Sequence, residues 1–318
     1  MQNWKSCVGR RRACLTVLTV VGLSMATATY QARQPSRAPI TGIQEVAENL
    51  YLLADSDPSD RSTWTGGNTA VWVTESGVVL VDTKLPGYGQ DILDRVSSVT
   101  DKPVTMILHT HTHFDHTGST TEFPEMVQVI AHENTAANMA RASCEAVTNC
   151  DAFKGENASY IPKRTFARRT SLFSGRDQID LFYFGRGHTN GDAFVVFPSV
   201  GTVHTGDMFQ RKALPFIDVN ASGGSAVEFG QTLTKAVDGL SGIDTVIPGH
   251  MNAPVAWSDF TDFAGFYNDL VRVAQEGRQA GRSIDEAASA YTVPARYRDF
   301  DADAGTVRTI MEHIYNDR

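Results

Sequence analysis

Short apolar runs rich in valine, isoleucine and phenylalanine alternate with turn residues along most of the chain. Runs of about four to eight such residues, bounded by glycine, asparagine or proline, are typical of buried β-strands. Apolar residues at helical spacing predict helices over 89–99, from Glu133 onward and over 227–240. The runs predict strands at 49–53, 69–74, 78–81, 104–108, 127–131, 179–184, 193–197, 202–204 and 245–247.

The alternation of strands and helices predicts an α/β fold. From Trp257 onward the pattern is helical, with breaks expected at Gly277 and near Pro294. No linker divides the body, so residues 42–318 are predicted to form a single domain in which 257–318 is a helical C-terminal part. Residues 142–167 are polar and lack periodicity, which indicates an insertion or a lid.

The first 28 residues have the order of a secretory signal peptide. Residues 1–12 are polar and basic, 13–25 are apolar, and 26–28 (Ala-Thr-Ala) fit the small-residue pattern of a cleavage site. A membrane anchor is the alternative, but the apolar run is shorter than the roughly 20 residues that cross a bilayer. We therefore expect residues 1–28 to be removed and 29–41 to be a linker. The mature protein is expected to be periplasmic or secreted, without stable membrane insertion.

Composition and charge exclude several classes of protein. Of the 318 residues, 42% are hydrophobic and 20% are charged, which excludes disordered and fibrous proteins. The signal segment holds four of the 28 basic residues and no acidic one. The rest of the chain therefore carries 24 basic against 36 acidic residues, a net charge of −12 beside the −8 of the whole. Such an acidic body repels phosphate backbones, so nucleic acid is not an expected partner.

Two of the four cysteines, Cys7 and Cys14, lie in the signal segment. The other two, Cys144 and Cys150, stand six positions apart in a polar stretch. In an exported protein such a pair favours a disulfide. Two thiolates on a metal are the alternative, but no histidine lies close enough in the sequence to help complete such a site. We expect a structural disulfide.

A predicted strand runs directly into a segment with four histidines and one aspartate, HTHTHFDH at 109–116. Alternation along an extended segment points His111 and His113 to one side, whereas Asp115 and His116 follow as the chain turns. Imidazole and carboxylate donors in one short loop suit two neighbouring metal ions, with zinc favoured and iron or manganese as alternatives. A solvated histidine tract that binds metal adventitiously is the competing interpretation, but such tracts rarely follow a buried strand.

Three later strand ends supply further candidate ligands. His188 lies in GRGHTNGD, Asp207 ends HTGD, and His250 ends PGH. Glycines beside these residues let the backbone turn sharply and approach a metal closely. Each residue alone would more often be an ordinary loop residue. Together, four strand ends that all supply His or Asp predict one site, because active sites collect at such ends.

In this order, HxHxDH at 111–116, GHTNGD, TGD and PGH resemble the motifs of the metallo-β-lactamase superfamily, over residues 42–256. The resemblance implies an αβ/βα sandwich that places its metals at one edge, between two sheets. It also implies a small-molecule substrate and two Zn²⁺ ions per chain. On this pattern one metal is bound by His111, His113 and His188 and the other by Asp115, His116 and His250, with Asp207 bridging them.

Three residues have expected roles around the metals. Asp115 would orient the attacking water and help to move its proton. Asp82, at the end of the 78–81 strand, is a candidate acceptor that fixes a ligand imidazole, or else a turn residue. His109 lies deeper in its strand, where we expect it to be buried or to support a ligand.

Departures from the family's lactamase subclasses bear on the substrate. The commonest subclass has Cys where this chain has Asp207, the second has Asn where this chain has His111, and the third lacks the Asp bridge. The full set of metal ligands, Asp207 included, is more similar to that of glyoxalase II and the acyl-homoserine lactonases. Export argues against a cytosolic glutathione thioester as substrate. The resemblance thus implies a secreted dinuclear zinc hydrolase whose metal-bridging hydroxide attacks a carbonyl, with a β-lactam or related cyclic amide or ester as the leading substrate.

Other functions stay open on the sequence. A lactonase or thioesterase of the glyoxalase II type would use the same ligands, whereas a mononuclear iron persulfide dioxygenase would use only two His and one Asp. A metal-dependent binding protein without turnover is a third class. Two residues are candidate substrate contacts. Asn220 falls where the first lactamase subclass places an Asn beside the substrate carbonyl, although a turn role competes, and Lys212 in Gln210–Lys212 offers a cation for a carboxylate.

Overall fold

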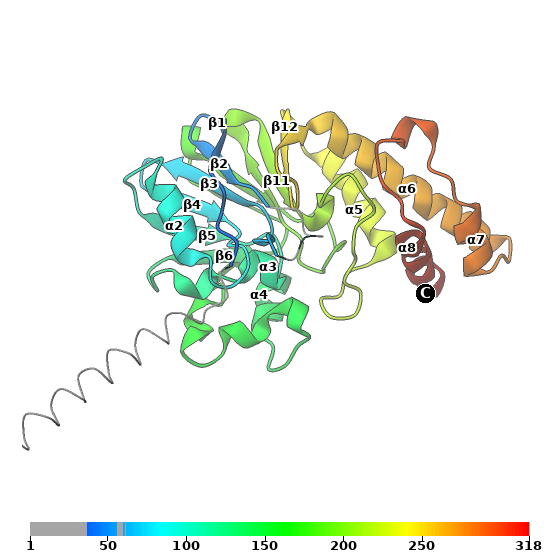
Figure 1. Cartoon of the computed structure of the whole chain (residues 1–318), viewed down its shortest axis with the longest axis horizontal. Helices are drawn as coiled ribbons and strands as arrows, with labels where there is room; N and C mark the ends of the chain where they lie inside the picture. Colours follow the sequence, from blue (N-terminus) through cyan, green and yellow to red (C-terminus); the bar gives the residue numbers. More distant parts are fainter. Residues whose placement is uncertain (1–36, 56–59, 61, 318) are drawn as a thin grey trace, which may run out of the picture. The chain divides into compact units, whose positions relative to one another are not determined.

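The computed structural model describes residues 37–55, 60 and 62–317 (Figure 1). The predicted signal peptide (1–28) and residues 29–36 of the predicted linker lie outside these residues. Contacts divide the chain into Met1–Ala38 and Pro39–Arg318, and every element below belongs to the second unit. In the described part of the chain, no helix has both the length and the apolar character that a membrane span needs.

The first sheet is mixed and has seven strands in the order of the sequence. Its first four strands pair antiparallel, and β4 to β7 continue in parallel. The parallel part places the carboxyl ends of β4, β5 and β6 at one edge. The strands are β1 (Gln44–Ala47), β2 (Leu50–Leu53), β3 (Thr69–Thr74), β4 (Gly77–Val81), β5 (Val104–Leu108), β6 (Gln128–His132) and β7 (Arg164–Phe166).

The second sheet has six strands in the order β13-β12-β11-β10-β9-β8. All neighbours pair antiparallel except β11 and β12, which are parallel and therefore end at the same edge. The strands are β8 (Arg169–Leu172), β9 (Ile179–Phe182), β10 (Phe194–Phe197), β11 (Thr202–Gly206), β12 (Thr245–Pro248) and β13 (Val255–Ala256).

Apolar side chains from both sheets pack against each other in one buried core, for example Trp72 of β3 against Phe197 of β10 at 5.2 Å between ring centroids. Helices cover the outer faces: α2 packs on the first sheet, and α5 and α6 pack on the second (Figure 1). This arrangement confirms the predicted αβ/βα sandwich. The α-helices are α2 (Gly89–Ser97), α3 (Phe114–Thr117), α4 (Glu133–Met139), α5 (Ala226–Gly239), α6 (Trp257–Gln279), α7 (Ile284–Ala290) and α8 (Ala304–Asn316).

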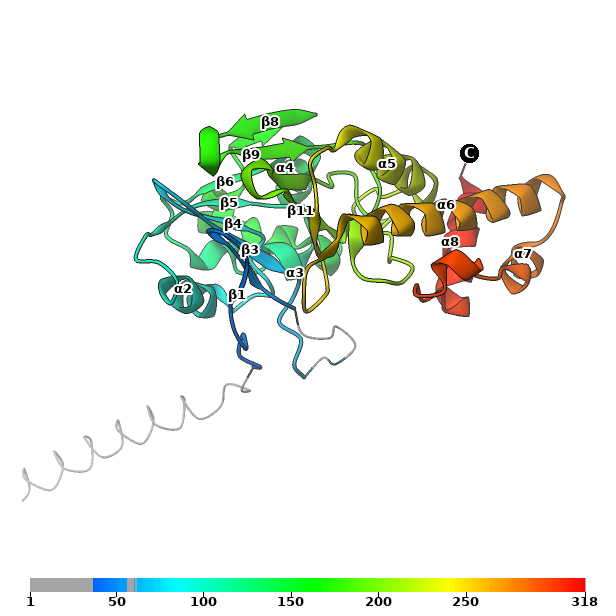
Figure 2. The same ribbon diagram turned by 90° about the horizontal axis from the view of Figure 1, so that it is seen from above.

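The C-terminal part is helical as the pattern indicates, but the break predicted at Gly277 is wrong. Helix α6 runs through this residue, and Figure 2 shows α6 extending past α8. A Cβ at Gly277 would lie 2.7 Å from the hydroxyl of Tyr315 and 3.1 Å from Cβ of Ala287. The glycine therefore permits close packing of α7 and α8 on α6. The break near Pro294 is present, since α7 ends at Ala290.

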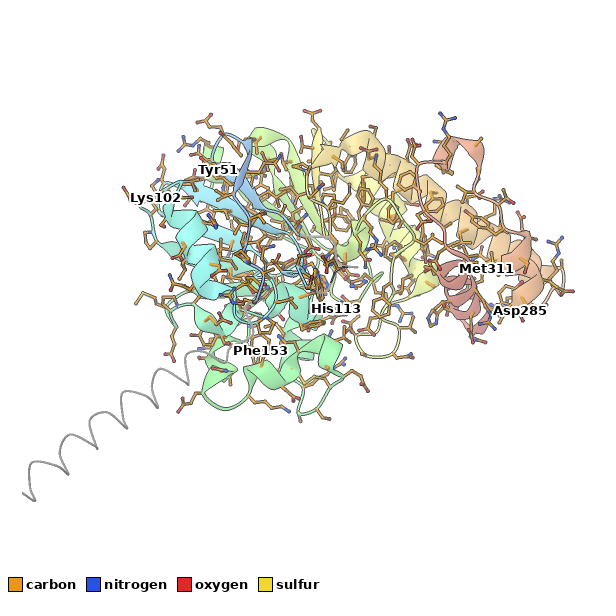
Figure 3. All side chains as sticks on the ribbon, viewed as in Figure 1. Tyr51, Lys102, His113, Phe153, Asp285 and Met311 are labelled. Atoms are coloured by element: carbon orange, nitrogen blue, oxygen red, sulfur yellow. A yellow bond between two sulfur atoms is a disulfide. The ribbon has the colours of Figure 1, made fainter. Side chains whose placement is uncertain are left out.

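Residues 142–167 form a series of short 3₁₀ turns, and the predicted disulfide joins Cys144 and Cys150. Figure 3 labels Phe153 within this segment and His113 at the strand ends. The segment is more than an insertion, however, because its last residues form β7 and extend the first sheet beside β6. Three residues of β7 are too few to produce a recognisable alternation, which is why the pattern does not reveal this strand.

Candidate metal centre

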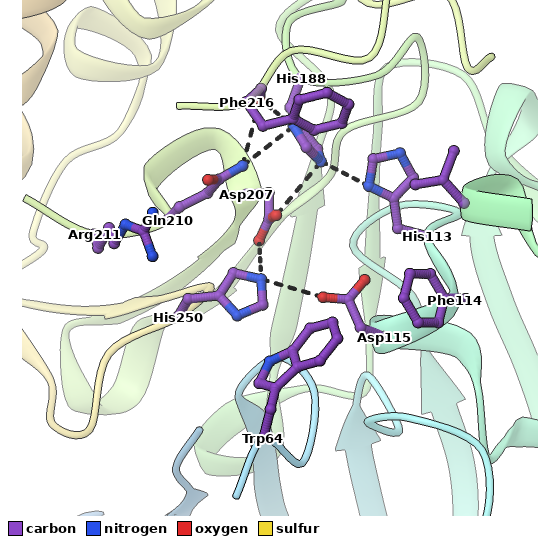
Figure 4. Close-up of a pocket in the computed structure, with 11 residues that line it drawn as sticks. Trp64, His113, Phe114, Asp115, His188, Asp207, Gln210, Arg211, Phe216 and His250 are labelled. Atoms are coloured by element: carbon purple, nitrogen blue, oxygen red, sulfur yellow. Dashed lines mark hydrogen bonds and ion pairs between the residues drawn. The ribbon is translucent and has the colours of Figure 1, made fainter. Parts of the chain in front are cut away.

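The candidate ligands come from loops at the edge where the parallel strands of both sheets end. The segment 109–116 follows β5 and turns into the short helix α3, whereas Asp207 directly follows β11. His250 lies two residues after β12, and His188 lies in the loop between β9 and β10. Figure 4 shows the side chains of these loops pointing toward a common space.

The donor atoms fall into two buried groups. In the first, Nδ1 of His113 lies 2.9 Å from Nε2 of His188, and the group also contains His111 and Asp207. In the second, Nε2 of His116 lies 3.3 Å from Nε2 of His250, and the group also contains Asp115. Within each group all donor atoms lie within 4.8 Å of one another. The structure thus brings together all seven residues that the sequence singles out.

Asp207 faces both groups at once. Its Oδ2 lies 3.4 Å from Nε2 of His188 in the first group. Its Oδ1 lies 3.2 Å from Nε2 of His116 and 3.3 Å from Nε2 of His250 in the second. One carboxylate is therefore placed to contribute an oxygen to each group.

The chemistry of these residues fits divalent metal ions. Nε2 of His111 is buried without a hydrogen-bond partner, although it lies among the other donors of its group. A buried polar atom of this kind normally has a partner, so it marks a place for a bound group. Imidazole and carboxylate donors at these spacings suit zinc, with iron and manganese as alternatives.

The outward-facing nitrogen of every one of the five histidines is held by another protein atom. Such contacts fix the ring and its tautomer, so the inward nitrogen is presented to a metal in one orientation. The partners are Thr110 Oγ1 for His111 (3.0 Å), Asp218 Oδ2 for His113 (3.1 Å), Asp82 Oδ2 for His116 (2.8 Å), the Phe216 carbonyl for His188 (2.8 Å) and Asp55 Oδ2 for His250 (2.8 Å).

Asp82 lies under the second group and contacts more than one residue. It occupies a left-handed backbone conformation with φ of 63° and accepts from the backbone N–H of Thr110 at 2.9 Å and from its hydroxyl at 2.6 Å. Its Oδ1 also lies 3.4 Å from Nδ1 of His109, whose Nε2 lies 2.9 Å from the hydroxyl of Thr120. His109 is therefore a buried neighbour of Asp82 and belongs to neither donor group.

Four of the candidate histidines fall into two kinds by the direction of their pKa shift. Burial lowers the pKa of His188 to about 4 and that of His111 well below its usual value, so both imidazoles are neutral at pH 7. Burial opposes the charge of His250 as well, but Asp207 and Asp55 raise its pKa to about 10. Asp207, Asp115 and Asp82 likewise raise the pKa of His116 against the effect of burial. A metal ion that binds these two imidazoles must therefore displace protons.

Asp55 and Asp218 are functional candidates that the sequence reading does not find. Each is a single aspartate in a loop without a motif, and each contacts a histidine far away in the chain, His250 and His113 respectively. For Asp218 a weak signal exists, since it begins the DVNASGG stretch that contains Asn220. For Asp55 the only signal is its place two residues after the end of β2.

A cavity of about 320 Å³ opens over the two groups. The ring of Phe216 is 59% exposed and lies 6.0 Å from that of His188, and Trp64 lies at the opposite side, beside Asp115 and His250 (Figure 4). The residues that line the cavity are Trp64, His113, Phe114, Asp115, Val147, His188, Asp207, Gln210, Arg211, Phe216 and His250.

The two predicted substrate contacts do not line this cavity. The amine of Lys212 forms an ion pair with Asp259 of α6, so the cation of the Gln210–Lys212 stretch that lines the cavity is Arg211. Asn220 lines a different cavity, of about 460 Å³, between the start of α5 and the end of α8. The structure therefore does not bring Asn220 or Lys212 to the metal side.

Gly67 lies so close to the second group that its lack of a side chain is required. A Cβ at this position would lie 2.3 Å from Cε1 and 2.5 Å from Nε2 of His116. We expect Gly67→Ala to displace this imidazole and to lower zinc affinity by about 10- to 100-fold, the usual effect of disturbing a ligand's support. Competition with a chromogenic chelator measures the affinity. Gly42→Ala is the matched control, because a Cβ there meets nothing within 4 Å; equal affinity in the two variants would contradict the prediction.

Comparison with protein families gives a match to the metallo-beta-lactamase superfamily over residues 62–250. Among characterised proteins, the 2,4-dinitroanisole O-demethylase subunit alpha of Nocardioides sp. (strain JS1661) is 30% identical over 138 residues, which is 42% of this chain and 38% of that protein. The metallo-beta-lactamase type 2 of Elizabethkingia meningoseptica is 23% identical over 164 residues, 50% of this chain and 59% of that protein. The chain thus spans less than two thirds of either relative.

Solved structures show the same fold. A metallo-beta-lactamase from Pontibacter korlensis superposes with a TM-score of 0.58 at 19% identity, covering 71% of this chain and 98% of that one. The stereoselective inverting sec-alkylsulfatase Pisa1 from Pseudomonas sp. superposes with a TM-score of 0.65 at 16% identity, covering 86% of this chain and 49% of that one.

Proposed function

The chain belongs to the metallo-beta-lactamase superfamily, and we propose that it is a zinc-dependent hydrolase of a small molecule. The leading substrate is a β-lactam or a related cyclic amide or ester. The observation that carries this proposal is the convergence of seven donors in two groups, five of which line a cavity with aromatic walls. We assign one zinc ion to each group and Asp207 to both.

In this proposal, residues around the cavity have separate roles in moving a proton and in excluding water. Bound zinc would supply the Lewis acidity that brings the pKa of a water near 7 and draws electron density from a substrate carbonyl. Asp115 lines the cavity, and its Oδ2 lies 3.4 Å from Nε2 of His250. From that place its carboxylate orients the attacking water and accepts a proton from it. Trp64 and Phe216 cover the substrate and exclude bulk water.

The shape and charge of the cavity indicate a partly apolar anion as substrate. Trp64 and Phe114 pack edge to face at 5.9 Å between ring centroids, and Phe216 lies across the cavity from Trp64 (Figure 4). Among the residues that the structure describes, none forms an ion pair with Arg211. Its guanidinium is thus available for a substrate carboxylate, which it can bind through two parallel hydrogen bonds.

Substituting Arg211 is expected to weaken substrate binding. Arg211→Ala should raise KM for an anionic substrate by about tenfold, the effect of losing a charge-assisted hydrogen bond of about 1.5 kcal/mol, while kcat changes little. Lys212→Ala is the matched comparison, because that amine is paired with Asp259. Steady-state kinetics on an anionic substrate and its neutral ester measure the effect. A rise in KM only for Lys212→Ala would restore the role that the sequence predicts for Lys212.

We also propose that the protein acts outside the cytoplasm. The order of residues 1–28 and the disulfide between Cys144 and Cys150 both support export to the periplasm or the medium. In this proposal residues 29–41 are a linker and residues 42–318 form the single domain that carries the metal centre. Fractionation of cells that express the full chain tests it: the mature protein should begin near residue 29 and appear in the periplasm or the medium, and uncleaved protein in the cytoplasm would overturn it.

An alkyl sulfate ester is the second candidate substrate. The match to the alkylsulfatase covers 86% of the chain, against 71% for the lactamase from Pontibacter. The larger share favours testing sulfate esters beside carbonyl substrates.

One experiment separates these functions. Zinc-loaded protein is assayed on a chromogenic β-lactam, a lactone, a thioester and a secondary alkyl sulfate, and its metal content is measured. Two zinc ions per chain and hydrolysis of the lactam or the lactone are the expected result. One iron ion per chain, together with oxygen consumption on a persulfide substrate, would indicate a dioxygenase and overturn the hydrolase proposal. A metal-loaded protein that turns over none of these substrates would indicate a binding protein.

A further inference from the structure

The disulfide between Cys144 and Cys150 closes a short ring of the chain, residues 144–150, beside the metal-binding segment 109–116. Cys150 is buried, and its backbone N–H donates to Sγ of Cys144 at 3.1 Å. Between the two cysteines lies a single 3₁₀ turn, Ala146–Thr148. The ring is therefore small, covalently closed and internally bonded.

Two hydrogen bonds join this ring to the loop that carries the ligands. The hydroxyl of Thr112, which stands between His111 and His113, donates to the carbonyl of Thr148 at 3.1 Å. The amide of Asn149 donates to the hydroxyl of Thr117, directly after His116, at 3.0 Å. Thr148 is fully buried, so its bond to Thr112 is shielded from water.

The same ring contributes a wall to the substrate cavity. Val147 lines that cavity together with His113, Phe114 and Phe216. Its neighbour Thr148 makes the bond to Thr112, so the position of the Val147 side chain is tied to that of the metal-binding segment.

We propose that the ring 144–150 is a specificity element of the active site, an inference that rests on the proposed function. The disulfide holds Val147 as one wall of the substrate cavity and holds the metal-binding segment from its outer side through Thr112 and Thr117. Closing the ring removes conformations that these residues would otherwise sample, so the wall is ordered before substrate arrives. Cleavage of the S–S bond takes up two electrons and two protons and leaves two thiols, and the wall then loosens.

Steady-state kinetics on four forms of the zinc-loaded protein test whether the disulfide and Val147 affect substrate binding. These are the oxidised wild type, the same protein reduced with a water-soluble phosphine, the Cys144→Ala/Cys150→Ala variant and Val147→Ala. The phosphine supplies the two electrons and becomes its oxide by taking oxygen from water. Loss of the disulfide should raise KM about tenfold, as expected from loosening one buried aliphatic contact, with a smaller change in kcat. Val147→Ala should raise KM most for substrates with a bulky group next to the scissile bond.

Insensitivity of the double variant to phosphine is the control, because it has no disulfide to reduce. If that variant does not fold, the wild type reduced after folding carries the test. Wild-type KM values in the reduced protein and in Val147→Ala would overturn the proposal.

A second readout does not need a substrate. Amide hydrogen exchange at residues 111–117 should be about tenfold faster after reduction, and Thr112→Val should reproduce this with the disulfide intact, because it removes one buried hydrogen bond. Unchanged exchange would show that the ring does not hold the segment. If the oxidised wild type hydrolyses no substrate but the exchange still responds, the proposed function fails while the positioning of the segment stands.

Discussion

Asp207→Ala is expected to lower kcat/KM by about 10³-fold or more and to reduce the zinc bound per chain. The single carboxylate faces donors of both groups, at 3.4 Å from Nε2 of His188 and 3.2 Å from Nε2 of His116. Its removal leaves the histidines without the negative charge that favours a dication among them. A Lewis-acid contribution of several kcal/mol is thereby lost, which corresponds to about three powers of ten in rate. Metal analysis by mass spectrometry and steady-state kinetics measure the two effects.

Asp238→Ala is the matched control for this prediction, because Asp238 is an exposed residue of α5. It should retain wild-type zinc content and rate. Two zinc ions per chain together with an unchanged kcat/KM in Asp207→Ala would refute the assignment of this carboxylate to both groups.

Asp115→Asn is expected to lower kcat by about 10²- to 10⁴-fold, the usual contribution of a general acid or base, while the chain stays folded. The substitution keeps an oxygen atom at the same place but removes the ability to accept a proton. The carboxylate lines the cavity and lies 3.4 Å from Nε2 of His250, so it lies between the cavity and the second donor group. Measurement of kcat, KM and zinc content distinguishes a lost proton acceptor from a lost ligand.

Retention of both metals with a much reduced kcat is the result expected of a proton acceptor. Loss of one zinc would instead assign Asp115 mainly to metal binding. A kcat within twofold of the wild type would exclude both roles. Asp101→Asn, in an exposed turn before β5, is the matched control and should leave kcat unchanged.

The sequence predicts most of the fold and the donor residues because their signals are local. The segment 109–116 carries four donors beside a strand, and apolar runs locate β4, β5, β11 and β12. Since parallel neighbours end at one edge, the loops after β11 and β12 are expected to lie together. That they meet the loop after β5, which belongs to the other sheet, is implied by the family resemblance.

The supporting contacts of the site have no such local signal. Asp55 and Asp218 stand alone in their loops and meet His250 and His113 only after folding. Lys212 and Arg211 are neighbours with the same charge, but Lys212 forms an ion pair with Asp259 on α6 whereas Arg211 lines the cavity. Side-chain direction of this kind depends on packing between elements, which a pattern along one chain does not contain.

The donor groups also have a mechanical consequence for the whole sandwich. Each donor group takes residues from loops of both sheets. The segment 109–116 follows β5 of the first sheet, whereas His188, Asp207 and His250 lie in loops of the second sheet. A metal ion bound by either group is therefore a cross-link between the two halves of the molecule. Because a ligand that binds only the folded state adds to its stability by mass action, resistance to heat and proteolysis should rise with the concentration of free zinc in the surroundings. Under the proposed function, the supply of metal would then control the lifetime of the protein as well as its rate of turnover.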